Sequence, residues 1–517
     1  MLHFSIIDKN PAKDGFSFIG WAFERDSSED IDDGFPVSSD ITLFAIWEKM
    51  PEPVFTVSFD ANGGVFEDDL EILDFQLNKD SVLYFSIIDK RPTKDGFSFK
   101  GWAFEKDASE GIVDGFSISS DITFFAIWEK NNIEDGSYAT PFIINSPYDF
   151  LSIGSDTGEH EGWKMNSCYK INFDIDMAGI NFSPIGSKDK KFTGVLMGNG
   201  KNIINIRLNS NELYQGLFSY LGNSGVIENL NISFDEIKIS SSGSGNVFFG
   251  GIAGYNEGNI KNCRVEISDF NSEITYNSKT AFYAGGVAGN NAGNIEHASA
   301  YFNITSASGN SYIGGISGYS SGNIGASSSE FNIEITKKGG TAYTGGITGN
   351  NESIISNSYS RGTLSISGVG VDNFAGLLAG NNNGTIKNAY TEGNIISQII
   401  RTRSCLGAIA GYNNGNIENC VTIAENISSV FIDKLHIKRI SGYNAASRGL
   451  LNNYALNTMI LEVEGEAVDI TSNKNEEHGE SISIESIEDK SFFNTIGWDF
   501  DIWTWDSEIK RPVIIAH

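Results

Sequence analysis

The sequence predicts an all-β protein whose main body is a right-handed parallel β-helix with coils of about 31 residues, preceded by smaller repeated modules. Two repeats of different length support this prediction: glycine-asparagine blocks in the second half, and a pair of near-identical segments at the beginning. The composition agrees with it. The chain has 57 glycines, only nine prolines and 20% charged residues, which suits many turns on a regular scaffold better than a disordered chain.

The shorter period is marked by the glycine that opens each block. Successive opening glycines are 35, 29, 31, 31, 31 and 31 residues apart. They are Gly254, Gly289, Gly318, Gly349, Gly380, Gly411 and Gly442. This spacing, combined with β-branched and small residues and without helical periodicity, predicts coils that stack on one another, each with three short strands.

Two aliphatic positions in each coil should superimpose inside the stack and form its core. The first position holds Ile252, Val287, Ile316, Ile347, Leu378 and Ile409. The second holds Ile260, Ile295, Ile324, Ile355, Ile386 and Ile417. A buried charge at such a position should break the stack, because an unpaired charge inside a protein is costly.

Another repeat position holds Asn262, Asn357, Asn388 and Asn419, with His297 and Ala326 in the two coils between the first two. Stacked amides can hydrogen-bond to each other and to the turn backbone, which satisfies polar groups that would otherwise be buried. We therefore expect an asparagine ladder along the axis.

The chain has four cysteines, Cys168, Cys263, Cys405 and Cys420, and no CxxC pair, so zinc-binding and thioredoxin-type functions lose support. Cys263 and Cys420 share one repeat position but lie several coils apart. A disulfide between them is excluded if the stack is regular. We expect the cysteines to be small buried side chains.

At the beginning of the chain, an offset of 81 residues aligns FSIIDKNPAKDGFSFIGWAFE at Phe4 with FSIIDKRPTKDGFSFKGWAFE at Phe85. The second copy starts earlier, with VFTVSFDANGG from Val54, and the first copy has no counterpart of that segment. We therefore expect a C-terminal fragment, or a gene model that begins at an internal methionine, with an export signal upstream.

Residues 54–130 resemble the Listeria–Bacteroides repeat, also called the internalin B-repeat. The matching residues are Phe59, Asp60, Asn62, Gly63, Gly64, Pro92, Gly96, Phe97, Phe99, Gly101, Trp102, Asp121, Ile122, Ala126 and Trp128. The resemblance implies a compact β-grasp module that serves as a spacer or adhesion unit in secreted bacterial proteins. We expect Trp102 to be a core residue rather than a ligand-stacking one.

The 31-residue blocks resemble the GLUG motif of large bacterial surface proteins, and the resemblance extends to the lead-in and to the ending WDFDIWTWDSEIKRPVI. The expected division is residues 1–49 for a truncated Listeria–Bacteroides repeat, 50–130 for a complete one, 131–232 for lead-in coils, 233–461 for GLUG coils and 462–517 for a C-terminal cap. In such a cap, aromatic residues can cover the last open coil, whose unpaired backbone would otherwise invite association.

The charge balance restricts the partners. With 36 basic and 66 acidic residues the net charge is −30, which argues against nucleic acid and anionic membranes. No apolar run approaches the roughly 18 to 20 residues that span a bilayer, and MLHFSIIDKN lacks the features of an export signal. We expect no membrane insertion in this chain.

Some carboxylates are candidates for catalytic or metal-binding groups. Glycosidases need two carboxylates across a cleft, but the outward position of the coils holds a mixture, Lys261, Glu296, Gly325, Ser356, Lys387 and Glu418. Asp174 and Asp176 are the most site-like pair, and we favour a structural role over calcium binding. The acidic run at residues 27–34 is expected to be a solvated loop.

Other motifs also lack catalytic support. His160 and Glu161 are not followed by the second histidine of a zincin HExxH motif. The GxSxG pattern at residues 318–322 aligns with GYNEG and GYNNG of other coils, so it is a variant of the repeat. Neither a phosphate-binding loop nor a dinucleotide motif is present. We predict no catalytic, cofactor-binding or metal-binding residues.

An aromatic stripe is the best candidate for ligand contact. It contains Tyr255, Tyr319, Tyr412 and Tyr443, each directly after an opening glycine. Such a stripe can stack on sugar rings, although packing along a β-helix explains it equally simply and is favoured.

Together these features predict a non-enzymatic, extracellular or cell-surface adhesin-like protein, in which an elongated β-helix contacts glycans or proteins of a host or neighbouring cell. The alternative is a carbohydrate-active enzyme, or the non-catalytic arm of a larger secreted hydrolase or peptidase. A purely structural spacer is a third hypothesis.

Overall fold

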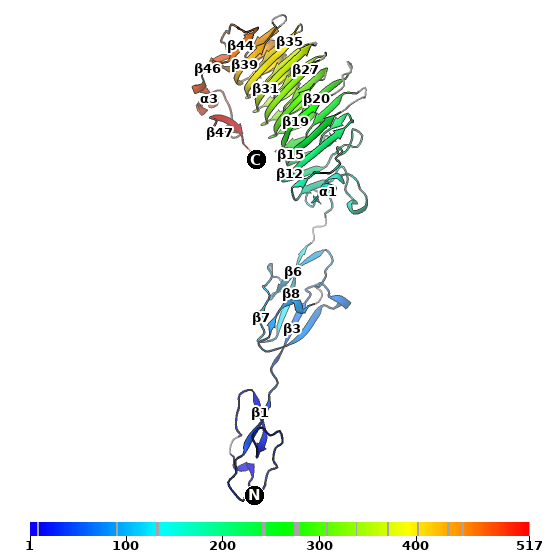
Figure 1. Cartoon of the computed structure of the whole chain (residues 1–517), viewed down its shortest axis with the longest axis vertical. Coiled ribbons are helices and arrows are strands. Elements are labelled where there is room, and N and C mark those ends of the chain that lie inside the picture. Colours follow the sequence, from blue (N-terminus) through cyan, green and yellow to red (C-terminus); the bar gives the residue numbers. More distant parts are fainter. Residues whose placement is uncertain are drawn as a thin grey trace. The chain divides into compact units, whose positions relative to one another are not determined.

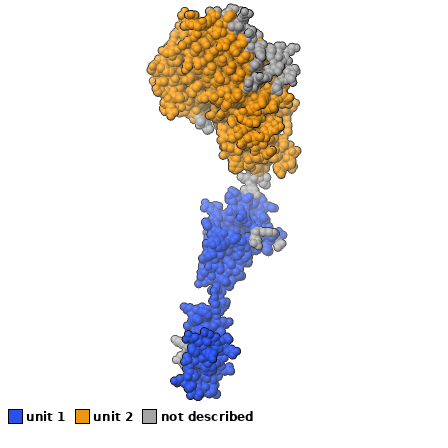
Figure 2. Space-filling model, in the orientation of Figure 1, with its two compact units in different colours: residues 1–133 blue, residues 134–517 orange. Residues whose placement is uncertain are grey.

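The chain forms two separately packed units, residues 1–133 and 134–517 (Figure 2). The computed structural model describes residues 1–515 except 8–9, 89–90, 131–133, 240–244, 273–279, 307–308, 338, 370–371, 401–402, 432–434 and 446–448. The α-helices of these described residues are the short α1 (Pro147–Leu151), α2 (Ile484–Ile487) and α3 (Lys490–Thr495). Single 3-10 turns lie at Phe4–Ile6, Glu67–Asp69, Phe85–Ile87 and Gly158–His160. All other regular secondary structure of these residues consists of strands, which confirms the all-β class.

In the first unit, the second repeat forms a four-stranded mixed sheet (Figure 1). Its strands lie in the order β4 (Ile72–Asn78), β3 (Val54–Asp60), β8 (Ile122–Lys130) and β6 (Phe97–Ala103), with β3 and β8 parallel. A short antiparallel pair, β5 (Val82–Leu83) and β7 (Phe116–Ser117), flanks it. Trp102 is 4% exposed and lies 4.9 Å from Phe59 and 5.2 Å from Phe99, between ring centroids. The expectation that Trp102 is a core residue is confirmed.

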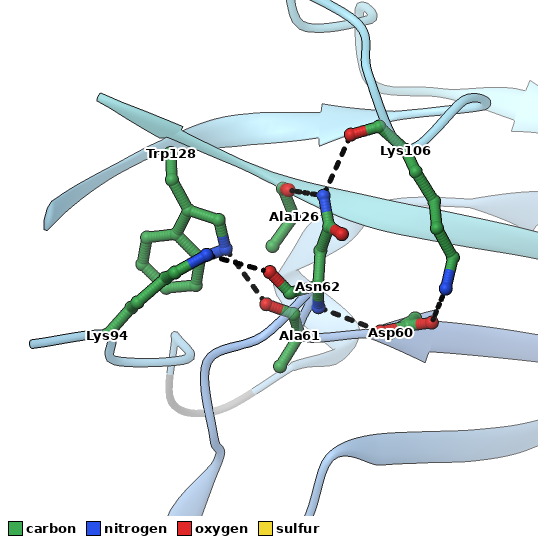
Figure 3. A network of polar contacts seen from close by, with 7 residues as sticks. All are labelled: Asp60, Ala61, Asn62, Lys94, Lys106, Ala126 and Trp128. Carbon is green, nitrogen blue, oxygen red and sulfur yellow. Dashed lines mark hydrogen bonds and ion pairs between the residues drawn. The ribbon is translucent and has the colours of Figure 1, made fainter. Parts of the chain in front are cut away.

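The DANGG segment of this repeat is held by a polar network (Figure 3). Asn62 adopts a positive φ of 49°, and its Nδ2 donates to the carbonyl oxygens of Lys106 (2.9 Å) and Ala126 (3.0 Å). Trp128 Nε1 donates to Ala61 O at 2.9 Å, and Lys94 Nζ donates to Asn62 O at 3.1 Å. These residues therefore tie the turn to strand β8 and to the loop after β6.

The first repeat contains an antiparallel pair, β1 (Phe16–Ala22) and β2 (Phe44–Lys49), in the same register as β6 and β8 of the second. In both pairs the register shifts just before the glycine that precedes the tryptophan, Gly20 or Gly101. In Gly101 the φ of 154° requires glycine. Among the described residues, the first repeat has no equivalents of β3 and β4.

The second unit is a parallel β-helix with three sheets, whose strands pair in parallel except for one antiparallel pair, Ile460–Val463 with Glu466–Ala467, at the end of the third. Sheet I contains β13 (Tyr214–Gln215), β16 (Val247–Gly250), β20 (Ala281–Gly285), β24 (Asn310–Gly314), β28 (Ala342–Gly345), β32 (Asn373–Gly376), β36 (Ser404–Gly407) and β40 (Leu435–Lys438). Sheet II contains β14 (Phe218–Leu221), β17 (Ala253–Asn256), β21 (Ala288–Asn291), β25 (Ser317–Ser320), β29 (Thr348–Asn351), β33 (Ala379–Asn382), β37 (Ala410–Asn413) and β41 (Ser441–Asn444).

Sheet III forms the broad side of the stack (Figure 1). It begins with β9 (Phe142–Ile144), β10 (Cys168–Ile171), β11 (Ile175–Asp176), β12 (Val195–Ser210) and β15 (Val226–Ile239). Each following coil adds a short and a long strand: β18 (Asn259–Lys261) and β19 (Arg264–Ser272), β22 (Asn294–Glu296) and β23 (Ser299–Ser306), β26 (Asn323–Gly325) and β27 (Ser328–Lys337), β30 (Ile354–Ser356) and β31 (Tyr359–Val369), β34 (Thr385–Lys387) and β35 (Tyr390–Ile400), β38 (Asn416–Glu418) and β39 (Val421–Ser429). It ends with β42 (Leu450–Leu451), β43 (Tyr454–Leu456), β44 (Ile460–Val463), β45 (Glu466–Ala467) and β46 (Glu480–Ile482).

Both predicted aliphatic ladders line the interior. All twelve of their side chains are 0% exposed. Ile355 lies between Ile324 and Ile386 in parallel register, and Ile347 N donates to Leu378 O at 2.8 Å. Consecutive members therefore stack one coil apart, and the predicted parallel β-helix is confirmed.

The predicted asparagine ladder is also present, at a sharp turn after the short strands of sheet III. Its six positions have φ between 46° and 53°, a left-handed conformation that asparagine tolerates. Asn388 Nδ2 donates to Asn357 Oδ1 and Asn419 Nδ2 donates to Asn388 Oδ1, both at 3.3 Å. Asn452 extends this run by donating to Asn419 at 2.9 Å.

A second ladder of polar side chains was missed by sequence reasoning; all of its members are fully buried except the last, Asn444, which is partly exposed. It occupies the last position of the sheet II strands and contains Asn256, Asn291, Ser320, Asn351, Asn382, Asn413 and Asn444. Asn351 Nδ2 donates to Asn382 Oδ1, and Asn382 Nδ2 donates to Asn413 Oδ1, each at 2.7 Å. The ladder ties coil to coil in the core.

The last coil is covered by residues 474–482. Ile440 N donates to Glu477 O and Asn453 N donates to Lys474 O, both at 2.8 Å, while β46 pairs with β43. Arg439 is 1% exposed, and its guanidinium donates to His478 O at 2.9 Å and Gly479 O at 3.0 Å. These bonds satisfy backbone groups that an open coil would leave unpaired.

The aromatic residues of the ending lie elsewhere than expected. After α2 and α3, the hairpin of β47 (Trp503–Asp506) and β48 (Arg511–Ile514) packs on the side of sheet III (Figure 1). Trp498 Nε1 donates to Asn419 O at 3.0 Å, and the Trp503 ring lies 6.0 Å from that of Tyr390. The expectation that aromatics cover the last coil is wrong, because the backbone of residues 474–482 already closes it.

Candidate ligand-binding face of the β-helix

The outward face of sheet I carries a continuous stack of aromatic rings, which we call the aromatic column. Its members are Tyr214, Phe248, Tyr283, Tyr312, Tyr343 and Phe374. The two-residue period of a strand places them there: in β20, Phe282 and Ala284 point into the core and Tyr283 points outward. Parallel pairing in register then sets each ring above the last.

The stacking is close along the whole column. Centroids of neighbouring rings are 4.6 to 5.1 Å apart, and their planes differ by 3° to 15°. Tyr283 and Tyr312 are the tightest pair, at 4.6 Å and 3°. Sequence reasoning missed the column, although an aromatic residue recurs two places before the glycine that ends most of these strands.

The predicted tyrosine stripe lies beside the column, on sheet II. Parallel register places Tyr255, Asn290 and Tyr319 in line, and Asn381, Tyr412 and Tyr443 continue that line. The stripe is therefore a mosaic of rings and amides. Its rings meet the column edge-on, as with Tyr319 against Tyr283 (6.2 Å, 80°).

This geometry limits how the face can meet a ligand. Burial raises the pKa of Tyr283, Tyr319 and Tyr343, so their hydroxyls stay neutral at physiological pH. Each interior ring of the column has both faces covered by neighbouring rings, which leaves only its edge and hydroxyl for contact. A sugar can stack on a ring face only at an end of the column, so packing explains the interior rings.

Other sequence candidates have structural roles. Asp174 accepts from Asn202 N (2.9 Å) and Asn202 Nδ2 (3.0 Å), and Asp176 accepts from Asn205 Nδ2 at 2.8 Å. These hydrogen bonds lower the pKa of both carboxyl groups. The pair thus fastens one coil to the next. Within the described part of the chain, no group of three or more potential metal ligands is found.

The remaining motifs are integrated into the coils or turns. Ser320 of the GxSxG pattern is a member of the buried polar ladder: it accepts from Asn291 Nδ2 at 3.0 Å and donates to Gly322 O at 2.8 Å. His160 contacts Asp149 at 3.2 Å. On sheet III, Lys261 lies opposite Glu296 and Lys387 opposite Glu418, so each of these lysines faces a carboxylate of the next coil.

The class of protein follows from this architecture: the second unit is a solenoid whose coils repeat one structural pattern, preceded by small β-sheet repeats. The family model of the Listeria-Bacteroides repeat domain matches residues 5–46 and 55–127. The resemblance stated for the N-terminal repeats is thereby confirmed. No helix among the described residues is both long and apolar enough to cross a bilayer.

Three curated proteins illustrate the similarity. A protein of Evansella cellulosilytica whose name describes a Gly-rich membrane protein is 34% identical over 25% of this chain and 14% of its own length. Halomucin of Haloquadratum walsbyi is 33% identical over 25% of this chain and 1% of its own length. Internalin H of Listeria monocytogenes is 30% identical over 25% of this chain and 23% of its own length. The matched part is thus less than a quarter of each relative.

A crystal structure described as an immunoglobulin A1 protease from Bacteroides ovatus aligns with 75% of this chain and 95% of its own, at 18% identity and a TM-score of 0.40.

Proposed function

We propose that this chain is a non-enzymatic adhesion segment of a cell-surface or secreted bacterial protein, and that its β-helix contacts glycans or proteins of a host or neighbouring cell. The observation that carries the proposal is the outward aromatic and amide face formed by sheets I and II. Rings and amides together offer apolar contact and hydrogen bonds to one ligand, the combination found in recognition surfaces.

The similarities support a surface location. Two relatives from Evansella cellulosilytica, 34% and 32% identical over about a quarter of this chain, have names that describe membrane proteins. In the proposed arrangement, residues 1–49 and 50–130 are spacers, 131–232 are lead-in coils, 233–461 are GLUG coils and 462–517 close and brace the stack. The net charge of −30 keeps such a surface soluble and repels polyanions.

Three of the buried polar residues support a scaffold rather than a catalyst. Asn382, Ser320 and Arg439 are all engaged in bonds between coils or to the covering segment. A catalytic group must instead be free to bond to substrate in a cleft.

The test is binding of the full chain to an array of glycans and matrix proteins, with product release monitored on the same glycans. Saturable binding without product release is the expected result, and heat-denatured chain is the control. Product release would favour the carbohydrate-active alternative. An absence of both would reject adhesion by this chain and favour the spacer hypothesis.

A further inference from the structure

A cation covers a ring at one end of the aromatic column and another ring on the neighbouring sheet II. At one end of the aromatic column, the Arg403 guanidinium lies 5.0 Å from the Phe374 ring centroid and pairs with Asp372 at 2.6 Å. On sheet II, Lys191 Nζ lies 4.4 Å from the Tyr220 ring centroid and pairs with Glu257 at 2.7 Å. Both rings are thus covered by a cation that a carboxylate holds in place.

Tyr214, at the other end of the column, has no such cover among the described residues. Its ring contacts are with Phe248, stacked at 5.1 Å and 3°, and with Tyr220 and Tyr255, whose ring planes are inclined to it by 62° and 74°. One ring face is therefore occupied by Phe248. Tyr214 also lines a surface groove of about 820 Å³, which lies within the size range of ligand sites.

The groove has the polar groups that a sugar needs. Its lining includes Asn209, Asn211, Asp189, Glu212 and Lys188, together with several serines. The exposed amides can donate to and accept from hydroxyls, and the carboxylates accept charge-assisted hydrogen bonds from them. A single cationic side chain would leave most of the amide and hydroxyl groups of the lining without a hydrogen bond to the ligand. A sugar ring with many hydroxyls could bond to several of them.

The turn that carries this lining is fixed in place. Glu212 N donates to Ser210 Oγ at 3.2 Å, and the fully buried Gln215 donates through Nε2 to Glu212 O at 2.7 Å. The Tyr214 ring is also held by stacking on Phe248, the next ring of the aromatic column. A preorganised site loses less entropy on binding than a flexible one.

We infer that this groove is a carbohydrate subsite, in which a neutral pyranose residue of a glycan stacks on the face of Tyr214 opposite Phe248 and bonds through its hydroxyls to Asn209, Asn211, Asp189 and Glu212. Acidic sugars are excluded, because the two carboxylates outnumber Lys188 and the whole chain is acidic. The inference rests on the proposed adhesive function and names its ligand class and location.

The experiment uses the full chain labelled with fluorotyrosine, in which the Tyr214 resonance is assigned from the Tyr214→Phe variant. The probes are maltotriose, mannotriose, galactotriose and triacetylchitotriose, with sialyllactose and tetralysine as charged comparisons. We expect saturable movement of the Tyr214 resonance by at least one neutral trisaccharide and by neither charged probe.

Tyr214→Leu should weaken binding of that trisaccharide about tenfold, the loss of one stacking contact. Phe374→Leu, at the covered end of the column, is the matched control and should change it less than about twofold. If Tyr214→Leu fails to fold, the exposed Asn211→Ala variant replaces it and should also weaken binding.

Three outcomes would overturn the inference: no neutral trisaccharide moves the Tyr214 resonance, tetralysine moves it instead, or Tyr214→Leu binds the trisaccharide as tightly as the parent chain. In each of these cases the adhesive function would still stand if the array shows saturable binding elsewhere. A silent array would reject both.

Discussion

Asn382 joins three coils of the β-helix: its Oδ1 accepts from Asn351 Nδ2 and its Nδ2 donates to Asn413 Oδ1, both at 2.7 Å, with all three side chains fully buried. Asn382 and Asn413 each use their donor toward one neighbouring coil and their acceptor toward the other, so these amides satisfy one another. Polar groups of this kind stabilise a core only while every member has its partner.

Asn382→Ala should therefore destabilise the second unit by about 3 kcal/mol, because two buried groups, Asn351 Nδ2 and Asn413 Oδ1, each lose their hydrogen bond to the next coil. Chemical denaturation followed by circular dichroism measures the loss. Asn383→Ala is the matched control: Asn383 is exposed and bonds to Glu352 at 2.7 Å, so its loss should cost less than about 1 kcal/mol. Equal effects of the two substitutions would contradict the ladder's importance.

Ile386→Asp should break the stack. Ile386 is 0% exposed between Ile355 and Ile417, and a buried carboxylate there would cost several kcal/mol. Limited proteolysis should cleave the variant rapidly within the coils. Ile354→Asp, at a neighbouring position that is 40% exposed, should stay as resistant as the parent chain. A resistant Ile386→Asp protein would refute the assignment of the aliphatic ladder.

The segment that covers the last coil should loosen in acid. His478 is 4% exposed, and burial, with Lys438 and Arg439 nearby, lowers its pKa from the ordinary 6.5 to about 4. The folded state therefore resists protonation, so stability is complete above about pH 6.5 and falls as the pH drops toward 4, by about 3 kcal/mol in all.

Hydrogen exchange of the amides in residues 474–482 between neutral and mildly acidic pH measures this effect. As the pH is lowered, the protection of these amides against exchange should decrease more than that of amides in the central coils, after correction for the intrinsic exchange rate. His478→Gln should remove the difference, since glutamine does not titrate. An unchanged pH profile in this variant would show that another group controls the segment.

The cysteines should differ in reactivity. All four thiols are free; Cys263, Cys405 and Cys420 are buried, and burial raises the pKa of each to about 12. Because the thiolate is the reactive form, iodoacetamide should label the partly exposed Cys168 first in the native chain. Peptide mass mapping identifies the labelled site, and denatured chain should react at all four. Early labelling of Cys263 would contradict a regular stack.

The sequence alone predicted the features that repeat in register. Ile355 and its equivalents could be placed inside because their spacing equals one coil, and the same spacing separated Cys263 from Cys420. The ladder at Asn357 followed from the same argument. The buried ladder at Asn382 repeats just as regularly, but an asparagine beside a turn glycine is ordinarily exposed, so its burial could not be inferred from its type.

The tertiary structure decided what depends on contacts between separate sheets or distant segments. The period places Tyr283 above Phe248, but only the bend between sheets I and II brings Tyr319 against it, and only the preceding coil leaves the Tyr214 face beside a groove. Trp498 contacts Asn419 across 79 residues, a relation that no local pattern encodes. Periodicity determines how coils stack because every coil repeats the same contacts, whereas lateral packing is made once and depends on the shape of the finished stack.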